Sequence, residues 1–542
     1  MSTSLPRIRD IYAGHSVFVT GATGFIGRIL VEKLLYSLPI KNIFVLIRDS
    51  KRHSAEERWA EITESLLFQR IRRECKEVIN KVVLVYGDIT QTNLGLSDAD
   101  LERCSFVFHV AATIKFDDAL KNSVELNVRG TDRVISLCHR MPKLECFLHC
   151  STAYANCEMG RVEEKVYPSP YDAHKLIDTV EWLNDDVLEA MTPKILGAKY
   201  NTYCLTKAIA ETMVAENGPS LPSVIIRPSI VSGVWRDGVP GWAHGIQGLS
   251  AYGYAVAMGA LTKVPGDLDN VIDAVPVDVV TNMMIVSSAW RSTQKDSKEV
   301  PVMTASTGVL NPGTLGMFND LANKASNTRY EPAIITRNKI WLMENVFGSV
   351  MDGLRTLQGK KPFWRRQLAR ISELYHAVEQ FISREFCFDN ESIPRLVDVM
   401  QEEDRRDFNF DVREMDIDDH VANCAAGLKR FIFKADLFDE KKMDAARERV
   451  QKFIMLNYAI VVFWCWIASI FITGSASPTW IFVLLSLVGV VYTAIEQRPV
   501  AGLVHKSVEE YRKEQEQYEE KPAESRERDS SDSDAKTEGG EF

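Results

Sequence analysis

The stretch Ser-Val-Phe-Val-Thr-Gly-Ala-Thr-Gly-Phe-Ile-Gly at residues 16–27 decides the fold of this chain. An apolar, β-branched run leads into three glycines, which stand at the start of an amphipathic segment. In this setting Gly21 permits a tight turn, Gly24 lets the backbone approach a pyrophosphate, and Gly27 permits close packing of helix on strand. A turn without a ligand is the alternative. The position between a strand and a helix favours a dinucleotide-binding loop.

Similar apolar runs follow the glycine-rich loop as far as about residue 235, and longer amphipathic segments separate them. Strands that alternate with helices predict βαβ units, so we expect an α/β fold with a Rossmann-type, doubly wound parallel sheet. Between about 240 and 350 the sequence is rich in Gly, Met and Ala with irregular spacing, which suits a substrate-binding lobe. The expected strands cover residues 17–20, 43–47, 82–86, 106–110, 146–150 and 224–227.

The chain of 542 residues is longer than one hydrophobic core usually organises, so several domains are expected. Residues 12–350 are assigned to the nucleotide-binding and catalytic domain, 351–450 to a mainly helical domain and 507–542 to a charged, disordered tail. The net charge of -10 and the absence of a basic motif argue against nucleic acid. Cysteines without companion ligands at zinc spacing predict no metal site.

Two uncharged stretches, 453–473 and 480–495, predict a membrane-anchoring hairpin. Basic residues precede the first stretch and follow the second, so both ends of the hairpin are expected on the cytosolic side. A pair of helices buried in a water-soluble core is the alternative interpretation. Tryptophans in both stretches favour a segment at the membrane interface.

The end of the second expected strand bears on the choice of cofactor. Arg48, with Lys51 and Arg52 nearby, suits the 2'-phosphate of NADPH, whereas a carboxylate at this place suits the ribose of NADH. Asp49 keeps NADH open, although NADPH is preferred. Asp88 and Ala111 follow the third and fourth strands, at the edge where ligands bind in open α/β sheets. The residues expected at the cofactor are Gly21, Thr23, Gly24, Phe25, Ile26, Gly27, Arg48, Asp88, Ala111 and Lys207.

Three further residues are candidates for catalysis. Tyr203 and Lys207 lie four positions apart in a helical stretch, so they share one face. A neighbouring ammonium favours the phenolate, which predicts a lowered pKa for Tyr203 and a usable proton donor. Ser151 follows another strand and is placed to bond a substrate carbonyl oxygen, with Thr152 as the alternative hydroxyl. The Tyr-Lys spacing alone is common on helix surfaces, and a strand-end serine that caps a turn is the alternative interpretation of Ser151.

The wording of these motifs resembles the fatty acyl-CoA reductase family of the extended short-chain dehydrogenase/reductase superfamily. The similarity extends over most of the chain, from about residue 12 to 500. The motifs that carry it are TGATGFIG (20–27), VLIR (45–48), HVAATIKFD (109–117), NVRGT (127–131), STAYAN (151–156), YCLTKAIAE (203–211), RPSIV (227–231), DAVPVD (273–278), FNFD (408–411) and GLKRF (427–431).

The resemblance implies that NADPH reduces a long-chain fatty acyl-CoA to a primary alcohol in two hydride steps, for ether lipid or wax synthesis. Tyr203 is then expected to donate protons, Lys207 to hold the nicotinamide ribose, and Ser151 to orient the carbonyl. The family further implies a bilayer anchor, with a peroxisomal membrane favoured over the endoplasmic reticulum and a catalytic domain facing the cytosol. A homo-oligomer is left open.

Two departures from the family's wording concern the acyl-length preference. The family's Asp-Trp followed by Tyr is replaced by Asp-Ile-Asp-Asp-His at residues 416–420, and Pro240–Trp242 is followed by Ala-His-Gly-Ile. Two other functions remain as alternatives: a sterol or other secondary-alcohol dehydrogenase with the same catalytic residues, and a non-catalytic membrane tether. The helical segment after residue 351 speaks against the first, and the intact Ser-Tyr-Lys set speaks against the second.

Overall fold

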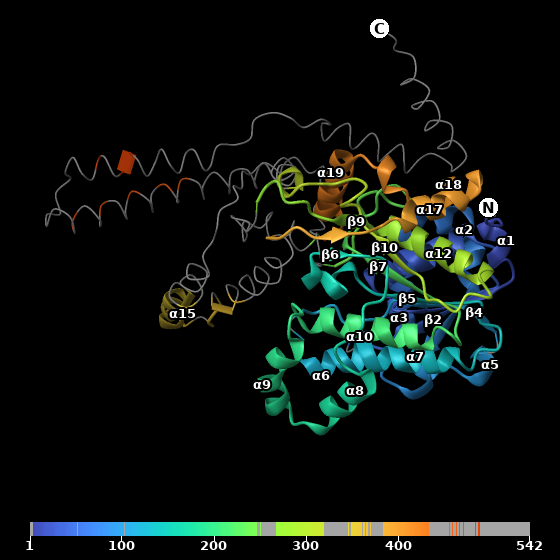
Figure 1. Ribbon diagram of the computed structural model, residues 1–542. Helices are drawn as coiled ribbons and strands as arrows, with labels where there is room; N and C mark the ends of the chain where they lie inside the picture. Colours follow the sequence, from blue (N-terminus) through green and yellow to red (C-terminus); the bar gives the residue numbers. More distant parts are fainter. Residues whose placement is uncertain are drawn as a thin grey trace, which may run out of the picture.

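The computed structural model describes residues 4–50, 52–101, 103–116, 118–245, 267–318, 348–359 and 383–432, with scattered positions up to 487. Its centre is a seven-stranded parallel sheet with the order β10-β7-β5-β4-β1-β2-β3 (Figure 1). The order runs outward in both directions from the middle of the sheet, which confirms the predicted α/β, doubly wound class. The strands are β1 (Ser16–Thr20), β2 (Asn42–Ile47), β3 (Val82–Tyr86), β4 (Cys104–His109), β5 (Cys146–Cys150), β7 (Ser223–Pro228) and β10 (Val302–Ala305).

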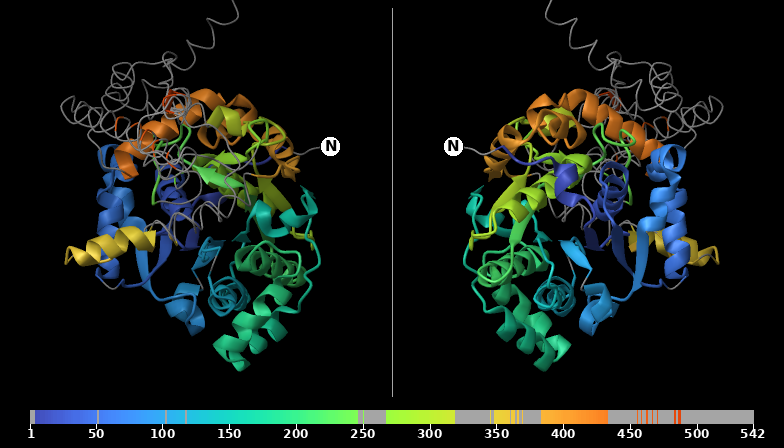
Figure 2. Two further views of the ribbon diagram at one scale, coloured as in Figure 1. Left: turned by 90° about the vertical axis from the view of Figure 1, so that its left-hand side faces the viewer. Right: turned by 90° about the vertical axis from the view of Figure 1, so that its right-hand side faces the viewer.

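Helices cover both faces of this sheet, so its strands are almost continuously apolar. Val17 and Val19 of β1 pack into the hydrophobic cluster that contains α2 and α12, whereas Phe18 packs into the cluster beneath α7 and α10. These two sets of helices lie on opposite faces of the sheet (Figures 1 and 2). The helices on the first face are α2 (Phe25–Ser37) and α12 (Val277–Thr293); those on the second include α7 (Gly130–Cys138), α8 (Ala173–Trp182) and α10 (Thr202–Asn217).

The register of the strands places the functional segments at one edge. Thr20 of β1 pairs with His109 of β4, and His109 pairs with His149 of β5. Because the strands are parallel, the glycine-rich loop, the segment after β4 and the segment after β5 leave the sheet on the same side.

The sequence did not indicate two of these elements, β10 and α12. Nearly every residue of α12 is buried, from Val277 to Ser292, so no polar face marks the helical period. β10 has only four residues. Both fall in the region that we interpreted as irregular.

Shorter elements complete the described chain. Two small parallel sheets pair β8 with β9 and β6 with β11. The bounds are α1 (Ile8–Tyr12), α3 (Ala55–Glu64), α4 (Gln69–Glu74), α5 (Asp98–Leu101), α6 (Leu120–Ser123), α9 (Asp185–Leu196), α15 (Gly348–Leu357), α17 (Ser392–Val399), α18 (Glu402–Asp407), α19 (Ile417–Gly427), β6 (Arg161–Val162), β8 (Ile230–Ser232), β9 (Ala274–Pro276) and β11 (Cys387–Phe388).

The C-terminal segment 383–432 packs directly on the helices that cover one face of the large sheet, beside α12 (Figures 1 and 2). Ile393 and Phe408 lie in the same hydrophobic cluster as α2 and α12. The Glu164 carboxylate accepts hydrogen bonds from the backbone N–H and the hydroxyl of Ser392 at the start of α17. The predicted boundary at residue 350 stays a prediction.

The predicted hairpin, 453–495, lies outside the described residues except for isolated positions, and the tail, 507–542, lies wholly outside them. In the part of the chain that the structure describes, no helix combines the length and the apolar character needed to cross a bilayer.

His420 of α19 faces β8 and is 1% exposed. Its Nε2 atom lies 2.8 Å from the Ser232 hydroxyl at the end of β8. Burial lowers the pKa of His420 to about 4. In the unfolded chain a histidine takes up a proton near pH 6.5, so the unfolded state binds more protons between these two values.

We therefore expect the chain to lose stability as the pH falls from 6.5 towards 4. At pH 5 the contribution of His420 to this loss is about 2 kcal/mol. The measurement is the free energy of unfolding in urea at pH 7 and pH 5, for the wild type and for His420→Gln, which keeps a hydrogen-bonding side chain but does not titrate. An equal loss in both proteins would contradict the assignment.

Candidate active site

The glycine-rich loop connects β1 to α2 as predicted. Gly21 has a φ of +74°, and a Cβ atom on it would stand 2.6 Å from the Ala111 backbone nitrogen after β4. Gly24 is the N-cap of α2, and a Cβ on Gly27 would overlap the Gly21 carbonyl oxygen. The loop therefore lies close to the strand ends and offers the free N–H groups of α2 to an anion, an arrangement that fits a dinucleotide pyrophosphate.

Two arginines contact Thr23 of this loop, and a third is bonded to one of them. Arg28 Nε donates to the Thr23 carbonyl at 2.9 Å, and Arg58 Nη2 donates to the Thr23 hydroxyl at 3.1 Å. The Arg58 guanidinium also bonds to the carbonyl of Arg48, whose own side chain pairs with Asp88. Arg48 is 66% exposed, so its guanidinium is accessible to a ligand phosphate. The sequence pointed to Arg48 and Asp88 but not to Arg28 or Arg58.

The alternative carboxylate, Asp49, is committed to the protein backbone. Its Oδ1 atom accepts a hydrogen bond of 2.9 Å from the backbone N–H of Ala55, at the start of α3. A carboxylate at this helix end is favoured by the free N–H groups. The group expected to bind the ribose of NADH is thus turned to another partner. The neighbouring Lys51 lies outside the described residues, and Arg52 is exposed.

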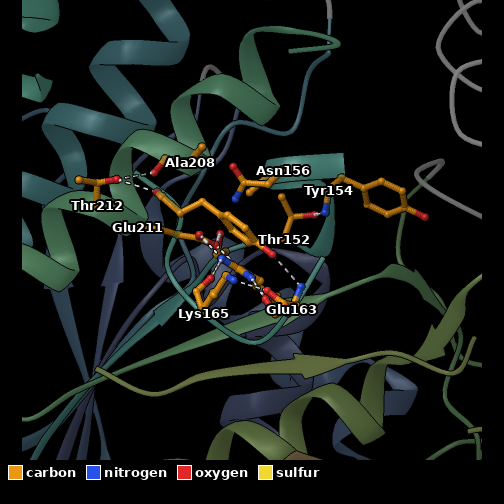
Figure 3. Close-up of polar contacts among 12 residues, drawn as sticks. Thr152, Tyr154, Asn156, Glu163, Lys165, Ala208, Glu211 and Thr212 are labelled. Carbon is orange, nitrogen blue, oxygen red and sulfur yellow. Dashed lines mark hydrogen bonds and ion pairs between the residues drawn. The ribbon is translucent and has the colours of Figure 1, made fainter. Parts of the chain in front are cut away.

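Tyr203 and Lys207 lie one turn apart at the start of α10, as predicted. Lys207 is 3% exposed, and its Nζ donates to the Cys150 carbonyl at the end of β5 at 2.6 Å. The Thr152 side chain lies beside the Tyr203 phenol and acts to lower its pKa. Thr152 also accepts from the backbone N–H of Tyr154 at 3.3 Å (Figure 3). The phenol, the ammonium and a hydroxyl therefore meet at the edge of the sheet that holds the glycine-rich loop.

The structure does not bring Ser151 to this point. Its hydroxyl donates to Glu211 Oε1 at 2.5 Å, deeper beneath α10. Adjacent residues of an extended chain point to opposite sides, so only one of Ser151 and Thr152 can face Tyr203. The position that we gave to Ser151 is thus corrected, and the alternative hydroxyl, Thr152, occupies it.

The pKa of Tyr203 also differs from the expectation. Burial, together with the nearby thiols of Cys150 and Cys204, raises the pKa of Tyr203 above its ordinary value, although the neighbouring Thr152 side chain acts in the other direction. Burial lowers the pKa of Lys207. The lowering of the Tyr203 pKa by Lys207 is not found. At neutral pH the phenol therefore carries the proton that a general acid must donate.

Asn127 shapes the wall beside the catalytic helix, although the sequence assigned it no role. It lies in the π-helical segment Val124–Arg129, and its side chain bonds to both backbone groups of Thr113. Its Nδ2 atom also donates to the Thr206 hydroxyl of α10 at 3.0 Å. Insertions of this kind in helices are frequent at functional sites.

A nucleotide-binding loop, a Tyr-Lys pair and a hydroxyl at one edge of a doubly wound sheet define a nicotinamide-dependent oxidoreductase. Two family models, both described as male sterility protein, match residues 19–284 and 343–435. The chain belongs to the fatty acyl-CoA reductase family. It is 32% identical to fatty acyl-CoA reductase 1 of Rattus norvegicus and 33% identical to that of Gallus gallus; each match covers 88% of this chain and 96% of the relative.

Solved structures support the fold. The terminal R domain of the myxalamid pathway matches with a TM-score of 0.51 at 16% identity, over 78% of this chain and 92% of that domain. The reductase domain of a non-ribosomal peptide synthetase from Mycobacterium tuberculosis also has a TM-score of 0.51, at 18% identity, over 79% and 94% of the two chains.

Proposed function

We propose that this chain reduces long-chain fatty acyl-CoA to primary fatty alcohol, releasing CoA, with NADPH as the reductant. The carrying observation is the meeting of Tyr203, Thr152 and Lys207 at the same sheet edge as the glycine-rich loop. The names of the related proteins support a thioester substrate, and their similarity extends over nearly their full length. Product alcohols of this kind suit ether lipid or wax synthesis.

The chain's own residues divide the work. Thr152 bonds the carbonyl oxygen, and Tyr203 donates a proton to the alkoxide that develops when the carbonyl is reduced. The buried Lys207 ammonium stabilises negative charge on that oxygen and binds the nicotinamide ribose. NADPH supplies the hydride when it is bound. The hemithioacetal loses CoA, and the same groups serve the aldehyde in the second step.

NADPH, rather than NADH, is supported by the chemistry around Thr23. Arg48 and Arg58 provide guanidinium groups next to the loop, and guanidinium binds phosphate through two parallel hydrogen bonds. Asp49, which would favour NADH, is held by Ala55. These two arginines would therefore hold the 2'-phosphate.

Arg58→Ala is expected to raise the KM for NADPH roughly 10- to 100-fold, because a charge-assisted hydrogen bond is lost. The KM for NADH should change less than about twofold, since NADH lacks the 2'-phosphate. Steady-state kinetics with both cofactors measure the effect. Arg103→Ala removes an exposed arginine that precedes β4, at the opposite end of the sheet, and controls for net charge. Equal losses with both cofactors would place the 2'-phosphate elsewhere.

The reaction is tested on detergent-purified full-length protein. Anaerobic NADPH consumption is followed with palmitoyl-CoA, and the extracted lipids are analysed for aldehyde and alcohol. We expect alcohol, with two NADPH consumed for each CoA released. Turnover of a sterol but not of acyl-CoA would favour a secondary-alcohol dehydrogenase, and NADPH binding without any turnover would favour a membrane tether.

We further propose that residues 453–495 anchor the enzyme to an intracellular membrane and that 351–450 form a helical domain beside the site. The apolar stretches and their basic flanks support the anchor. A peroxisomal membrane is favoured, the endoplasmic reticulum comes second, and the catalytic domain faces the cytosol.

A further inference from the structure

Glu211 is a buried carboxylate on the catalytic helix to which the proposed chemistry assigns no role. It follows Tyr203 and Lys207 at intervals of four residues, so the three side chains lie along one face of α10. Glu211 is 1% exposed, and both of its oxygens are bonded. Ser151 donates to Oε1 at 2.5 Å, and Arg227 donates to Oε1 at 2.8 Å and to Oε2 at 2.6 Å.

Arg227 of β7 completes this buried pair and is fully shielded from solvent. Besides Glu211, its guanidinium donates to the Glu163 carbonyl at 3.0 Å and to the Lys165 carbonyl at 2.8 Å. Figure 3 shows these partners gathered around one centre, with Glu211 arriving from α10 and Glu163 and Lys165 from the segment after β6. Two strand ends, one helix and one loop thus share a single ion pair.

A buried ion pair such as this one contributes little net stability to a core. Two buried charges lose their hydration, and an apolar pair of similar volume often stabilises a core equally well or better. Directional hydrogen bonds, however, fix the relative positions of the elements that they join more closely than apolar contacts do. Ser151 immediately precedes Thr152, so its bond to Glu211 ties the strand end that carries the hydroxyl to the helix that carries the phenol.

We propose that Glu211 and Arg227 are positioning residues that, through Ser151, hold Thr152 and Tyr203 at the separation that proton transfer requires. A misplacement of reacting groups by about 1 Å can lower a rate roughly 100-fold. The pair is shielded from solvent and acts through α10 and the end of β5. The proposal rests on the roles proposed above for Thr152 and Tyr203.

The charge of Glu211 also reaches Lys207, one turn away. It acts to raise the pKa of Lys207 and opposes the larger lowering by burial, as does the Cys150 thiol. His109 and His149, from β4 and β5, face the same ammonium, and burial lowers the pKa of both imidazoles, with the charge of Lys207 adding to the effect. The Glu211 carboxylate therefore helps to keep Lys207 protonated beside the neutral imidazoles of His109 and His149.

The first test is Ser151→Ala, which removes only the hydrogen bond between Ser151 and Glu211. We expect kcat with palmitoyl-CoA to fall roughly 10-fold, with the KM values for NADPH and acyl-CoA within about twofold of wild type. A purely structural hydrogen bond would change the melting temperature but leave kcat per folded molecule intact. That second result, measured on full-length protein with the folded fraction determined by NADPH binding, would overturn the proposal.

The second test places Glu211→Gln and Ser151→Ala in a double-mutant cycle. Glu211→Gln alone should lower kcat roughly 100-fold, and the double variant should be no slower than Glu211→Gln within about twofold, because both act through one link. Multiplied losses would overturn the proposal. Exposed Glu216→Gln, on the same helix, is the matched control and should keep wild-type kcat.

Two further variants complete the design. If Glu211→Gln does not fold, Arg227→Lys replaces it, because lysine keeps the charge but loses the two-pronged bond; an intermediate loss of kcat at unchanged KM is then expected, and no loss overturns the proposal. Thr152→Ala tests the site itself. Wild-type turnover by Thr152→Ala would refute the site assignment itself. If Thr152→Ala loses activity but Ser151→Ala keeps wild-type kcat, only the positioning role of Glu211 and Arg227 is refuted.

Discussion

Tyr203→Phe is expected to lower kcat roughly a thousandfold for both acyl-CoA and fatty aldehyde, because the only change is the loss of the donating hydroxyl. The phenyl ring should keep its place, since Tyr203 already packs edge-on against Phe116 with the ring centroids 5.7 Å apart. KM for NADPH should stay within about twofold. Stopped-flow oxidation of NADPH with each substrate separates the two hydride steps.

Tyr200→Phe is the matched control for this prediction. Tyr200 lies three residues earlier, and its hydroxyl accepts a hydrogen bond of 2.8 Å from Arg384 rather than facing Thr152. Its loss should change kcat less than about threefold, the range expected for one exposed hydrogen bond. If Tyr203→Phe kept more than about a tenth of the wild-type rate, another group would be the proton donor.

The sequence was informative where a local pattern has a single structural solution. Strands such as β1 and β5 are buried along their whole length, and they stand out as apolar runs. The glycine-rich loop is equally local, because Gly21 and Gly27 have neighbours that leave no room for a side chain. By contrast, α12 is buried on all sides and carries no amphipathic signal.

The candidate site was predicted in part, for a similar reason. The spacing of Tyr203 and Lys207 is set within one helix, so it could be read directly. The choice between Ser151 and Thr152 depends on which side of an extended chain faces α10, and the local sequence does not determine that side. Arg58 lies on α3, ten residues beyond Arg48, and reaches Thr23 only because the helix folds back over the loop.

A second large effect is expected where the C-terminal segment meets the loop beside the cofactor site. Gly427, the last residue of α19, lies directly against Gly241, and a Cβ atom on Gly427 would overlap the Gly241 carbonyl oxygen. Gly241 has a φ of +72° and in turn packs against the Asn423 carbonyl. Both partners are backbone atoms, so neither can yield by changing a rotamer.

The loop on the other side of this contact is itself tightly held. Its residue Trp242 packs against Phe25 of the glycine-rich loop, with the ring centroids 5.8 Å apart. The Asp278 carboxylate accepts three backbone N–H groups, those of Trp235, Arg236 and Asp237. Asp237 is paired in turn with Lys33 of α2. Because these contacts fix the loop, a displacement of Gly241 is expected to move Trp242 and, through it, Phe25 of the glycine-rich loop.

Gly427→Ala is consequently expected to lower the free energy of unfolding by roughly 3 kcal/mol, as overpacking against a rigid backbone does, and to weaken NADPH binding. Urea unfolding and a cofactor titration measure the two effects.

Gly353→Ala, in α15, is the control: among the residues that the structure describes, no atom lies within 4 Å of a Cβ at that position, so the same substitution in a helix should be neutral or stabilise by up to about 1 kcal/mol. Equal behaviour of the two variants would mean that α19 does not dock on the loop. A loss of stability without a change in NADPH affinity would mean that Trp242 does not transmit the displacement to Phe25.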